Sequence, residues 1–127
     1  MSAQRLLVID DDPAFCRFLR TAAEGCGYEV RATTEATAFK SAYEETPPDL
    51  IALDLGMPGN DGIELLRFLA DQKCHSRILI VSGFGGRILK AAQRLGTERG
   101  LNMVGTIDKP VRIAELQALL NGLRIPD

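Results

Sequence analysis

The chain alternates between short, nearly continuous apolar runs and longer segments in which apolar residues recur every three or four positions. A continuous apolar run of about five residues is typical of a strand buried on both faces of a parallel sheet, and the longer spacing is typical of an amphipathic helix. Five segments have the first pattern: 5–9, 28–32, 49–53, 77–81 and 101–107. Helical segments follow them in turn, at about 13–25, 34–45, 63–72, 87–99 and from 113 onward.

Turn and capping residues mark the boundaries of these elements. Asp12 is suited to cap the first helix, because its carboxylate can accept a hydrogen bond from a backbone N–H of the first turn. Pro13 suits the first helical position, where its missing N–H is not needed. Pro47-Pro48 ends the second helix, and the loop 56–62 is rich in turn-forming residues.

This alternation predicts an α/β fold, a doubly wound sheet of five parallel strands with right-handed crossovers and helices on both faces. A chain of 127 residues fits one domain, and no linker or repeat interrupts it, so we expect a single domain over residues 1–127. In such a sheet, ligands bind at the carboxyl ends of the strands.

Composition and charge exclude several classes of function. Fifteen Lys and Arg residues stand against 17 Asp and Glu residues, for a net charge of −2, so direct binding to nucleic acid is not expected. No apolar run approaches the roughly 20 residues of a membrane span, and no role at a membrane is expected. Cys16, Cys26 and Cys74 are odd in number and lack metal-ligand spacing, which predicts reduced thiols in a cytoplasmic protein.

Polar residues suited to chemistry follow four of the five expected strands. Asp10 and Asp11 follow the first strand, Asp54 the third, Ser82 the fourth and Lys109 the fifth. Taken singly, each is explained by a capping turn or a solvated loop. Because the carboxyl ends of parallel strands meet at one edge of the sheet, their joint occurrence indicates a site.

Three carboxylates with one ammonium and one hydroxyl are suited to phosphoryl transfer. Crowded carboxylates repel one another, and Mg²⁺, which prefers oxygen ligands, removes that repulsion. The metal and the ammonium neutralise the phosphoryl oxygens, the hydroxyl donates a hydrogen bond, and one carboxylate attacks in line. No histidine is required, because an ionised carboxylate is already a nucleophile.

The ordered set of motifs resembles a response-regulator receiver domain over essentially the whole chain. The matching segments are Leu7-Val-Ile-Asp-Asp-Asp-Pro13, Asp54-Leu-Gly-Met-Pro-Gly-Asn-Asp-Gly62, Val81-Ser82-Gly83 and Asp108-Lys109-Pro110. The resemblance implies a flavodoxin-like sheet with strand order 2-1-3-4-5. It also implies a protein that is not an enzyme in its own right but catalyses its own phosphorylation and dephosphorylation.

The resemblance implies a role for each acidic residue. Asp54 would accept a phosphoryl group from a sensor histidine kinase or a phosphotransfer protein. Asp11 would be a direct Mg²⁺ ligand, and Asp10 would act mainly through water. Asp54 itself and the backbone carbonyl of Gly56 would supply the other protein ligands.

The resemblance also assigns the residues that contact the phosphoryl group and transmit the signal. Lys109 would contact that group, and Ser82 would move toward it. Many receivers carry an aromatic switch residue three positions before the lysine, where this chain has Thr106, so the usual coupling is not expected. Gly56 offers no side chain over the site, whereas Phe84, two positions after Ser82, offers a large one.

The spacing between Ser82 and Lys109 is several residues longer than in the commonest receivers. Twenty-six residues separate them, and the extra length falls in 93–104. The expected helix breakers in this region are Gly96, Gly100 and Gly105. The string from Ser82 to Val111 is similar to receivers fused to EAL-type cyclic-di-GMP phosphodiesterase domains. The 127 residues contain no such output domain, so we expect either a stand-alone receiver or the amino-terminal part of a longer chain.

A basic stripe on the fourth helix is a candidate docking surface. Arg87, Lys90 and Arg94 recur at helical spacing. A solvated helix face explains the stripe, and docking of an acidic partner is the alternative. An output domain or partner protein would then be contacted through the fourth helix and the fifth strand.

Two other functions remain as alternatives. A haloacid-dehalogenase-like aspartyl-phosphate hydrolase would use the first strand's aspartates, but it leaves Asp54 and its loop unexplained. A receiver-like module that signals by binding alone would keep the fold, but it does not require the complete set of site residues.

Overall fold

The computed structural model describes residues 4–58, 61–83 and 86–124. For residues 86 and 87 it describes the backbone alone. The strands are β1 (Gln4–Ile9), β2 (Tyr28–Thr33), β3 (Leu50–Asp54), β4 (Arg77–Ser82) and β5 (Asn102–Asp108). The helices are α1 (Pro13–Gly25), α2 (Ala36–Glu45), α3 (Asp61–Asp71), α4 (Gly86–Glu98) and α5 (Ile113–Gly122). The expected order of five strands and five helices is confirmed.

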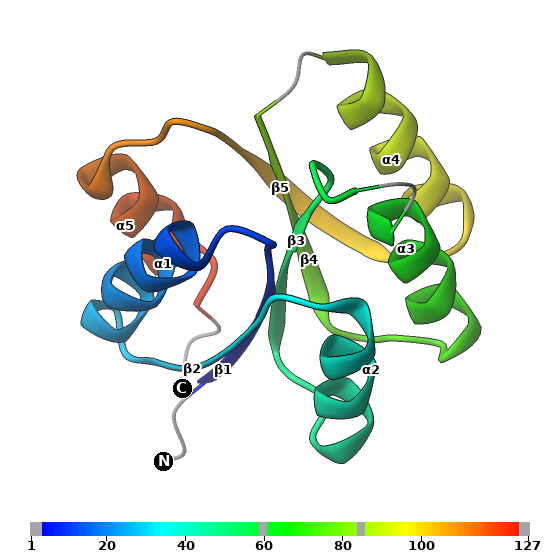
Figure 1. Ribbon diagram of the computed structural model, residues 1–127, viewed down its shortest axis with the longest axis horizontal. Helices are drawn as coiled ribbons and strands as arrows, with labels where there is room; N and C mark the ends of the chain where they lie inside the picture. Colours follow the sequence, from blue (N-terminus) through cyan, green and yellow to red (C-terminus); the bar gives the residue numbers. More distant parts are fainter. Residues whose placement is uncertain (1–3, 59–60, 84–85, 125–127) are drawn as a thin grey trace.

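The sheet has the order β2-β1-β3-β4-β5, and all four pairings are parallel. Helices α1 and α5 cover one face, and α2, α3 and α4 cover the other (Figure 1). The doubly wound sheet and its strand order are therefore as predicted. The carboxyl ends of β1, β3, β4 and β5 lie at the same edge, at the top centre of Figure 1.

Each inner strand contributes alternate side chains to two cores. Ile51 and Leu53 pack with α2, α3 and α4, whereas Leu50 and Ala52 pack with α1 and α5. All five residues of β3 are buried. Because both faces of this strand are covered, its sequence reads as a continuous apolar run instead of an alternating one.

The capping prediction for α1 is confirmed. Asp12 is the N-cap, and its side chain accepts a 3.0 Å hydrogen bond from the N–H of Ala14, with Pro13 as the first helical residue. The start of α2 differs from the expectation, because the helix begins at Ala36 and not at residue 34. Glu35 caps it without a side-chain hydrogen bond, so no capping side chain marked the boundary.

The long connection to β5 holds one correction. Gly96 does not break α4 but lies inside it, and a Cβ there would lie 2.4 Å from the sulfur of Met103 on β5. Gly96 therefore allows the helix to approach the sheet. Gly105 also lies inside its element, beside a register shift between β4 and β5 at Ile78 and Leu79. Gly100, with φ of +82°, ends the helical segment as expected.

The structure also describes the three cysteines and the length of the helices. Cys16, Cys26 and Cys74 are buried free thiols. Among the residues that the structure describes, no helix combines the length and apolar character that crossing a membrane requires.

Candidate functional site

Asp10 and Asp54 lie side by side at the carboxyl edge of the sheet. The pairing of β1 with β3 places Ile9 opposite Leu53, so the residue that follows Ile9 lies next to the last residue of β3. The two residues are only 1 % and 2 % exposed. Burial of two carboxylates requires a compensating charge or ligand.

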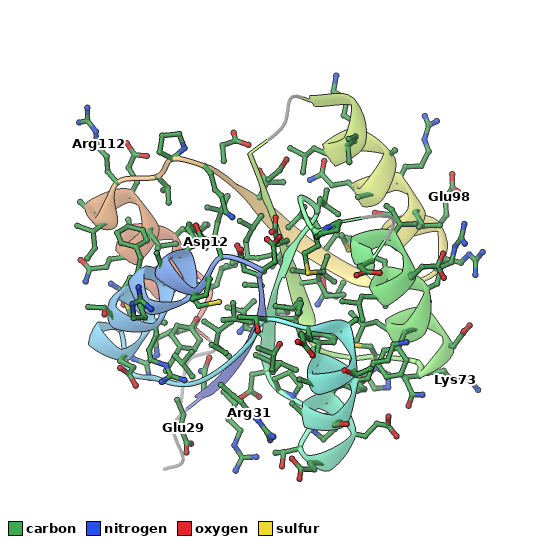
Figure 2. The ribbon with its side chains drawn as sticks, in the orientation of Figure 1. Asp12, Glu29, Arg31, Lys73, Glu98 and Arg112 are labelled. Carbon is green, nitrogen blue, oxygen red and sulfur yellow. The ribbon has the colours of Figure 1, made fainter. Side chains whose placement is uncertain are left out.

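Asp11 joins these two carboxylates in a cluster that can hold a metal ion. One carboxylate oxygen from each of Asp10, Asp11 and Asp54 lies within 4.8 Å of the others. Asp11 is exposed, and Asp12, labelled in Figure 2, caps the start of α1 beside this edge. Three carboxylates with one side open to water form the donor set that Mg²⁺ prefers, because this ion keeps several of its water ligands.

Backbone N–H groups orient the two buried carboxylates. Asp10 Oδ1 accepts a 2.9 Å hydrogen bond from the N–H of Asp12, and Asp54 Oδ1 accepts a 2.8 Å hydrogen bond from the N–H of Gly56. The structure places Gly56 beside Asp54, and its contact there is through its N–H. In each carboxylate, Oδ2 is the oxygen that faces Lys109.

Lys109 brings the only described side-chain cation within ion-pair distance of these carboxylates. Its Nζ lies 2.7 Å from Asp10 Oδ2 and 3.8 Å from Asp54 Oδ2. The backbone N–H of Lys109 donates a 2.9 Å hydrogen bond to the carbonyl of Ser82, which ties the end of β5 to that of β4. The centroid of the Phe15 ring, on α1, lies 4.4 Å from Nζ of Lys109.

The charges in the site shift one another's pKa values. Burial raises the pKa of Asp54 to about 6; the Gly56 N–H and the Lys109 ammonium oppose the rise, and the Asp10 carboxylate adds to it. Burial lowers the pKa of Lys109, but Asp10 and Asp54 outweigh that effect and raise the pKa overall. The lysine is therefore a persistent cation beside a carboxylate that is destabilised when ionised.

Ser82 is the last residue of β4 and is 2 % exposed. The register of β3 with β4 pairs Asp54 with Val81, so Ser82 lies one residue beyond that pair, at the same edge. Thr106 lies in β5, where it pairs with Ile80 of β4 and is half-buried. A small side chain therefore occupies the position three residues before Lys109.

Part of the predicted basic stripe on the fourth helix lies within the described residues. Lys90 and Arg94 are exposed on α4. The side chain of Arg87 and all of Phe84 lie outside the described residues. Ile88, on the same helix, is an exposed apolar residue.

Two residues of the site were not identified from the sequence. Phe15 has the helical spacing of a core residue, and it does pack against the core from a half-buried position, but its ring also contacts the lysine. Gly62 in α3 lies where an added Cβ would be 3.0 Å from the carbonyl oxygen of Asp54. For Gly62, its fixed spacing from Asp54 in the loop motif was a signal available in the sequence. For Phe15, no feature of the local sequence indicated a contact with the lysine.

Comparison with known proteins identifies relatives of this arrangement. The family model described as the response regulator receiver domain matches residues 6–121. The KDP operon transcriptional regulatory protein KdpE of Escherichia coli is 37% identical over 117 residues, which cover 91% of this chain and 48% of that protein. The DNA-binding response regulator MtrA of Mycobacterium tuberculosis is 38% identical over 66 residues, 52% of this chain and 29% of that protein. The chain therefore spans about half the length of the first relative and less of the second.

Solved structures show the same fold. A response regulator from Colwellia psychrerythraea superposes with a TM-score of 0.83 at 33% identity, covering 96% of this chain and 97% of that one. A CheY-like receiver domain protein from Methanospirillum hungatei superposes with a TM-score of 0.79 at 24% identity, covering 95% and 93% of the two chains, and shows the fold alone.

Proposed function

This chain belongs to the response regulator receiver domain family, and on that premise we propose that it accepts a phosphoryl group on Asp54 in a two-component signalling system. One observation carries the assignment to this residue. Asp54 is a buried carboxylate at the carboxyl edge of the sheet, 3.8 Å from the ammonium of Lys109 and clustered with two further carboxylates.

The proposed reaction is an in-line substitution at phosphorus. An oxygen of ionised Asp54 forms a bond to the phosphorus atom, and the bond from phosphorus to the leaving group breaks, with its electron pair departing on that group. The leaving group is an imidazole of a histidine kinase or phosphotransfer protein, or acetate when the donor is acetyl phosphate. Lys109 neutralises the transferred oxygens, and the Ser82 hydroxyl donates a hydrogen bond to one of them.

Asp10, Asp11, Asp54 and the Gly56 carbonyl are the proposed protein ligands of Mg²⁺. The ion supplies charge neutralisation of the phosphoryl oxygens when it is bound. Asp11 is the natural direct ligand because it is exposed and free to turn, whereas Asp10 is already engaged by Lys109 at 2.7 Å. We also propose that the same groups support self-catalysed phosphorylation and dephosphorylation, the latter by admitting water to the acyl phosphate.

The experiment is intact-mass analysis after incubation with acetyl phosphate, with and without Mg²⁺. We expect one phosphate adduct that requires Mg²⁺ and is absent from Asp54→Asn. Asp61→Asn, which removes an exposed carboxylate from the next helix, is the matched control and keeps the adduct. Beryllofluoride-induced NMR shifts cover the case of an adduct too short-lived to weigh.

Two outcomes contradict the proposal. An adduct that survives in Asp54→Asn and disappears in Asp10→Asn assigns the chemistry to the first strand, as in a haloacid-dehalogenase-like hydrolase. Neither an adduct nor a beryllofluoride response in the wild type assigns the chain to receiver-like modules that signal by binding alone.

For the output, we propose a partner or output domain that docks on α4 and β5, where Lys90 and Arg94 are exposed. We further propose that the chain belongs with receivers fused to EAL-type phosphodiesterase domains, on the strength of its long Ser82–Lys109 spacing. The names of KdpE and MtrA describe transcriptional or DNA-binding regulators instead. The complete coding sequence distinguishes the two, because a phosphodiesterase domain after residue 127 supports the proposal and a DNA-binding domain contradicts it.

We propose a cytoplasmic location and a single folding unit over residues 1–127. The three free buried thiols support the first, because reduced cysteines persist in a reducing compartment. The continuous sheet, with a core on each face, supports the second. Cell fractionation tests the location, and one cooperative transition shared by fluorescence and circular dichroism tests the folding unit.

A further inference from the structure

The ring of Phe15 lies against the ammonium group of Lys109, with 4.4 Å between Nζ and the ring centroid. Phe15 is in the first turn of α1 and Lys109 follows β5, so the contact joins opposite ends of the chain. An ammonium group within about 6 Å of an aromatic face is attracted to the ring's negative quadrupole. The roles assigned so far leave this contact unexplained.

The ring is one of three neighbours that decide where the ammonium lies. The 2.7 Å between Nζ and Asp10 Oδ2 is a close ion pair, whereas the 3.8 Å between Nζ and Asp54 Oδ2 is a looser one. The ammonium of Lys109 therefore lies closer to Asp10 than to Asp54. As a result, the lysine attracts Asp54 Oδ2 without taking up its lone pairs.

We propose that Phe15 is a positioning residue for phosphoryl transfer, which holds Lys109 on the Asp10 side so that Asp54 remains open to the incoming phosphorus atom. The inference rests on the proposed function of Asp54. In the absence of the ring, the ammonium loses one of the attractions that keep it there and approaches Asp54 more closely. A lysine hydrogen-bonded to Asp54 competes with the phosphorus atom for the same oxygen.

Phe18 provides a matched control on the same helix. Its ring centroid lies 6.0 Å from that of Phe15, and both rings line a hollow of about 490 Å³ together with Gly83, Lys109 and Pro110. Both are half-buried and pack against the same core. Among the described contacts, only the Phe15 ring faces the lysine, so replacing either residue removes similar packing but only one removes the ring–ammonium contact.

The first measurement is the rate of phosphorylation by acetyl phosphate at saturating Mg²⁺. For Phe15→Leu we expect the maximal rate to fall about 2- to 30-fold, the range that loss of one cation–π contact gives, with little change in the half-saturating donor concentration. Phe15→Tyr keeps the rate, because it keeps the ring. Phe18→Leu stays within about twofold of the wild type.

The second measurement follows Lys109 itself and needs no phosphorylation. The ring current of Phe15 should move the ε-methylene proton resonances of Lys109 upfield in the NMR spectrum, with the assignment made from Lys109→Arg. The shift should disappear in Phe15→Leu and persist in Phe18→Leu. Site-specific trifluorophenylalanine at position 15 keeps the shape of the ring but weakens its quadrupole, so the rate should fall part of the way.

Three results overturn the proposal: Phe15→Leu at the wild-type rate, Phe18→Leu slowed as much as Phe15→Leu, or the trifluorinated ring at the full rate. If Phe15→Leu does not fold, the tyrosine and fluorinated variants decide. If the wild type takes no phosphate, the proposed function of Asp54 fails, and the Lys109 resonances alone decide whether the ring positions the lysine.

Discussion

Asp54 combines a side chain that is almost completely buried with a second carboxylate close by. A carboxylate deprived of water is less stable when ionised, and the Asp10 charge adds to this. Its pKa of about 6 lies above the value of 3.8 that it has when solvated. Between these two values, the unfolded state loses its proton while the folded state retains it. The free energy of unfolding therefore falls as the pH rises through this window, and the penalty is fully present above pH 6.

Asp54→Asn should for this reason stabilise the metal-free protein at pH 7.5, by about 1–3 kcal/mol, because it removes a charge but keeps the shape. The gain should shrink as the pH falls from 7.5 to 5 and be nearly absent at pH 4. Urea unfolding in EDTA at these pH values measures it. Asp71→Asn, at an exposed carboxylate that ends α3, is the control and should change little. A variant that is no more stable than the wild type at pH 7.5 would show that Lys109 fully compensates the buried charge.

At the level of elements, the packing of α3 against the end of β3 helps to position Asp54. Gly62, the second residue of α3, lies where an added Cβ would be 3.0 Å from the carbonyl oxygen of Asp54 and 3.2 Å from the Cα of Leu55. Both neighbours are backbone atoms at the end of a buried strand, so they cannot rotate away. The helix therefore approaches Asp54 more closely than a residue with a side chain at position 62 would allow.

We expect Gly62→Ala to destabilise the protein by about 1 kcal/mol, since the strain of an extra methyl group exceeds the gain in helix propensity. Phosphorylation should slow as well, because the shift falls on Asp54. Gly122→Ala, in α5, meets nothing within 4 Å and should be neutral or slightly stabilising. Chemical denaturation and the acetyl phosphate assay measure the two effects. Equal stabilities for the two variants would mean that the β3–α3 turn yields to a methyl group.

The elements of this chain were predictable where one local signal decided them. Buried strands such as β3 were recognisable as continuous apolar runs, and Asp12 with Pro13 marked the start of α1. Gly96 was misjudged because its role depends on Met103, which packs against it from another element. Local propensity treats a glycine as a helix breaker, whereas close packing of a helix on a sheet can require one.

The same division holds for the candidate site. Asp10 and Asp54 could be brought together from the sequence, since parallel strands end at one edge of the sheet. The contact of Phe15 with Lys109 could not, because it depends on how α1 lies against the loop after β5. The pKa shift of Asp54 was equally inaccessible, because it depends on burial that all the surrounding elements create together.

At the scale of the whole molecule, the site brings together side chains from three strands that lie far apart in the sequence. Asp10 and Asp11 follow β1, Asp54 ends β3 and Lys109 follows β5. In the unfolded chain these groups are far apart, so a ligand that needs several of them binds only the folded state. Binding of such a ligand stabilises the entire domain by mass action.

Mg²⁺ should accordingly raise the melting temperature of the domain, with a stabilisation of about 2.7 kcal/mol at one hundred times its dissociation constant. Asp11→Ala should abolish the response yet leave the metal-free stability within about 0.5 kcal/mol, because this carboxylate is exposed. Asp12→Ala is the matched control: it removes the α1 cap and about 1 kcal/mol of stability, but Asp12 is outside the carboxylate cluster and the response to Mg²⁺ should persist. Thermal melts across a Mg²⁺ titration, with Ca²⁺ run in parallel, measure both. A response that survives in Asp11→Ala would move the ion away from the Asp10–Asp11–Asp54 cluster, because an ion held there loses its exposed ligand in that variant.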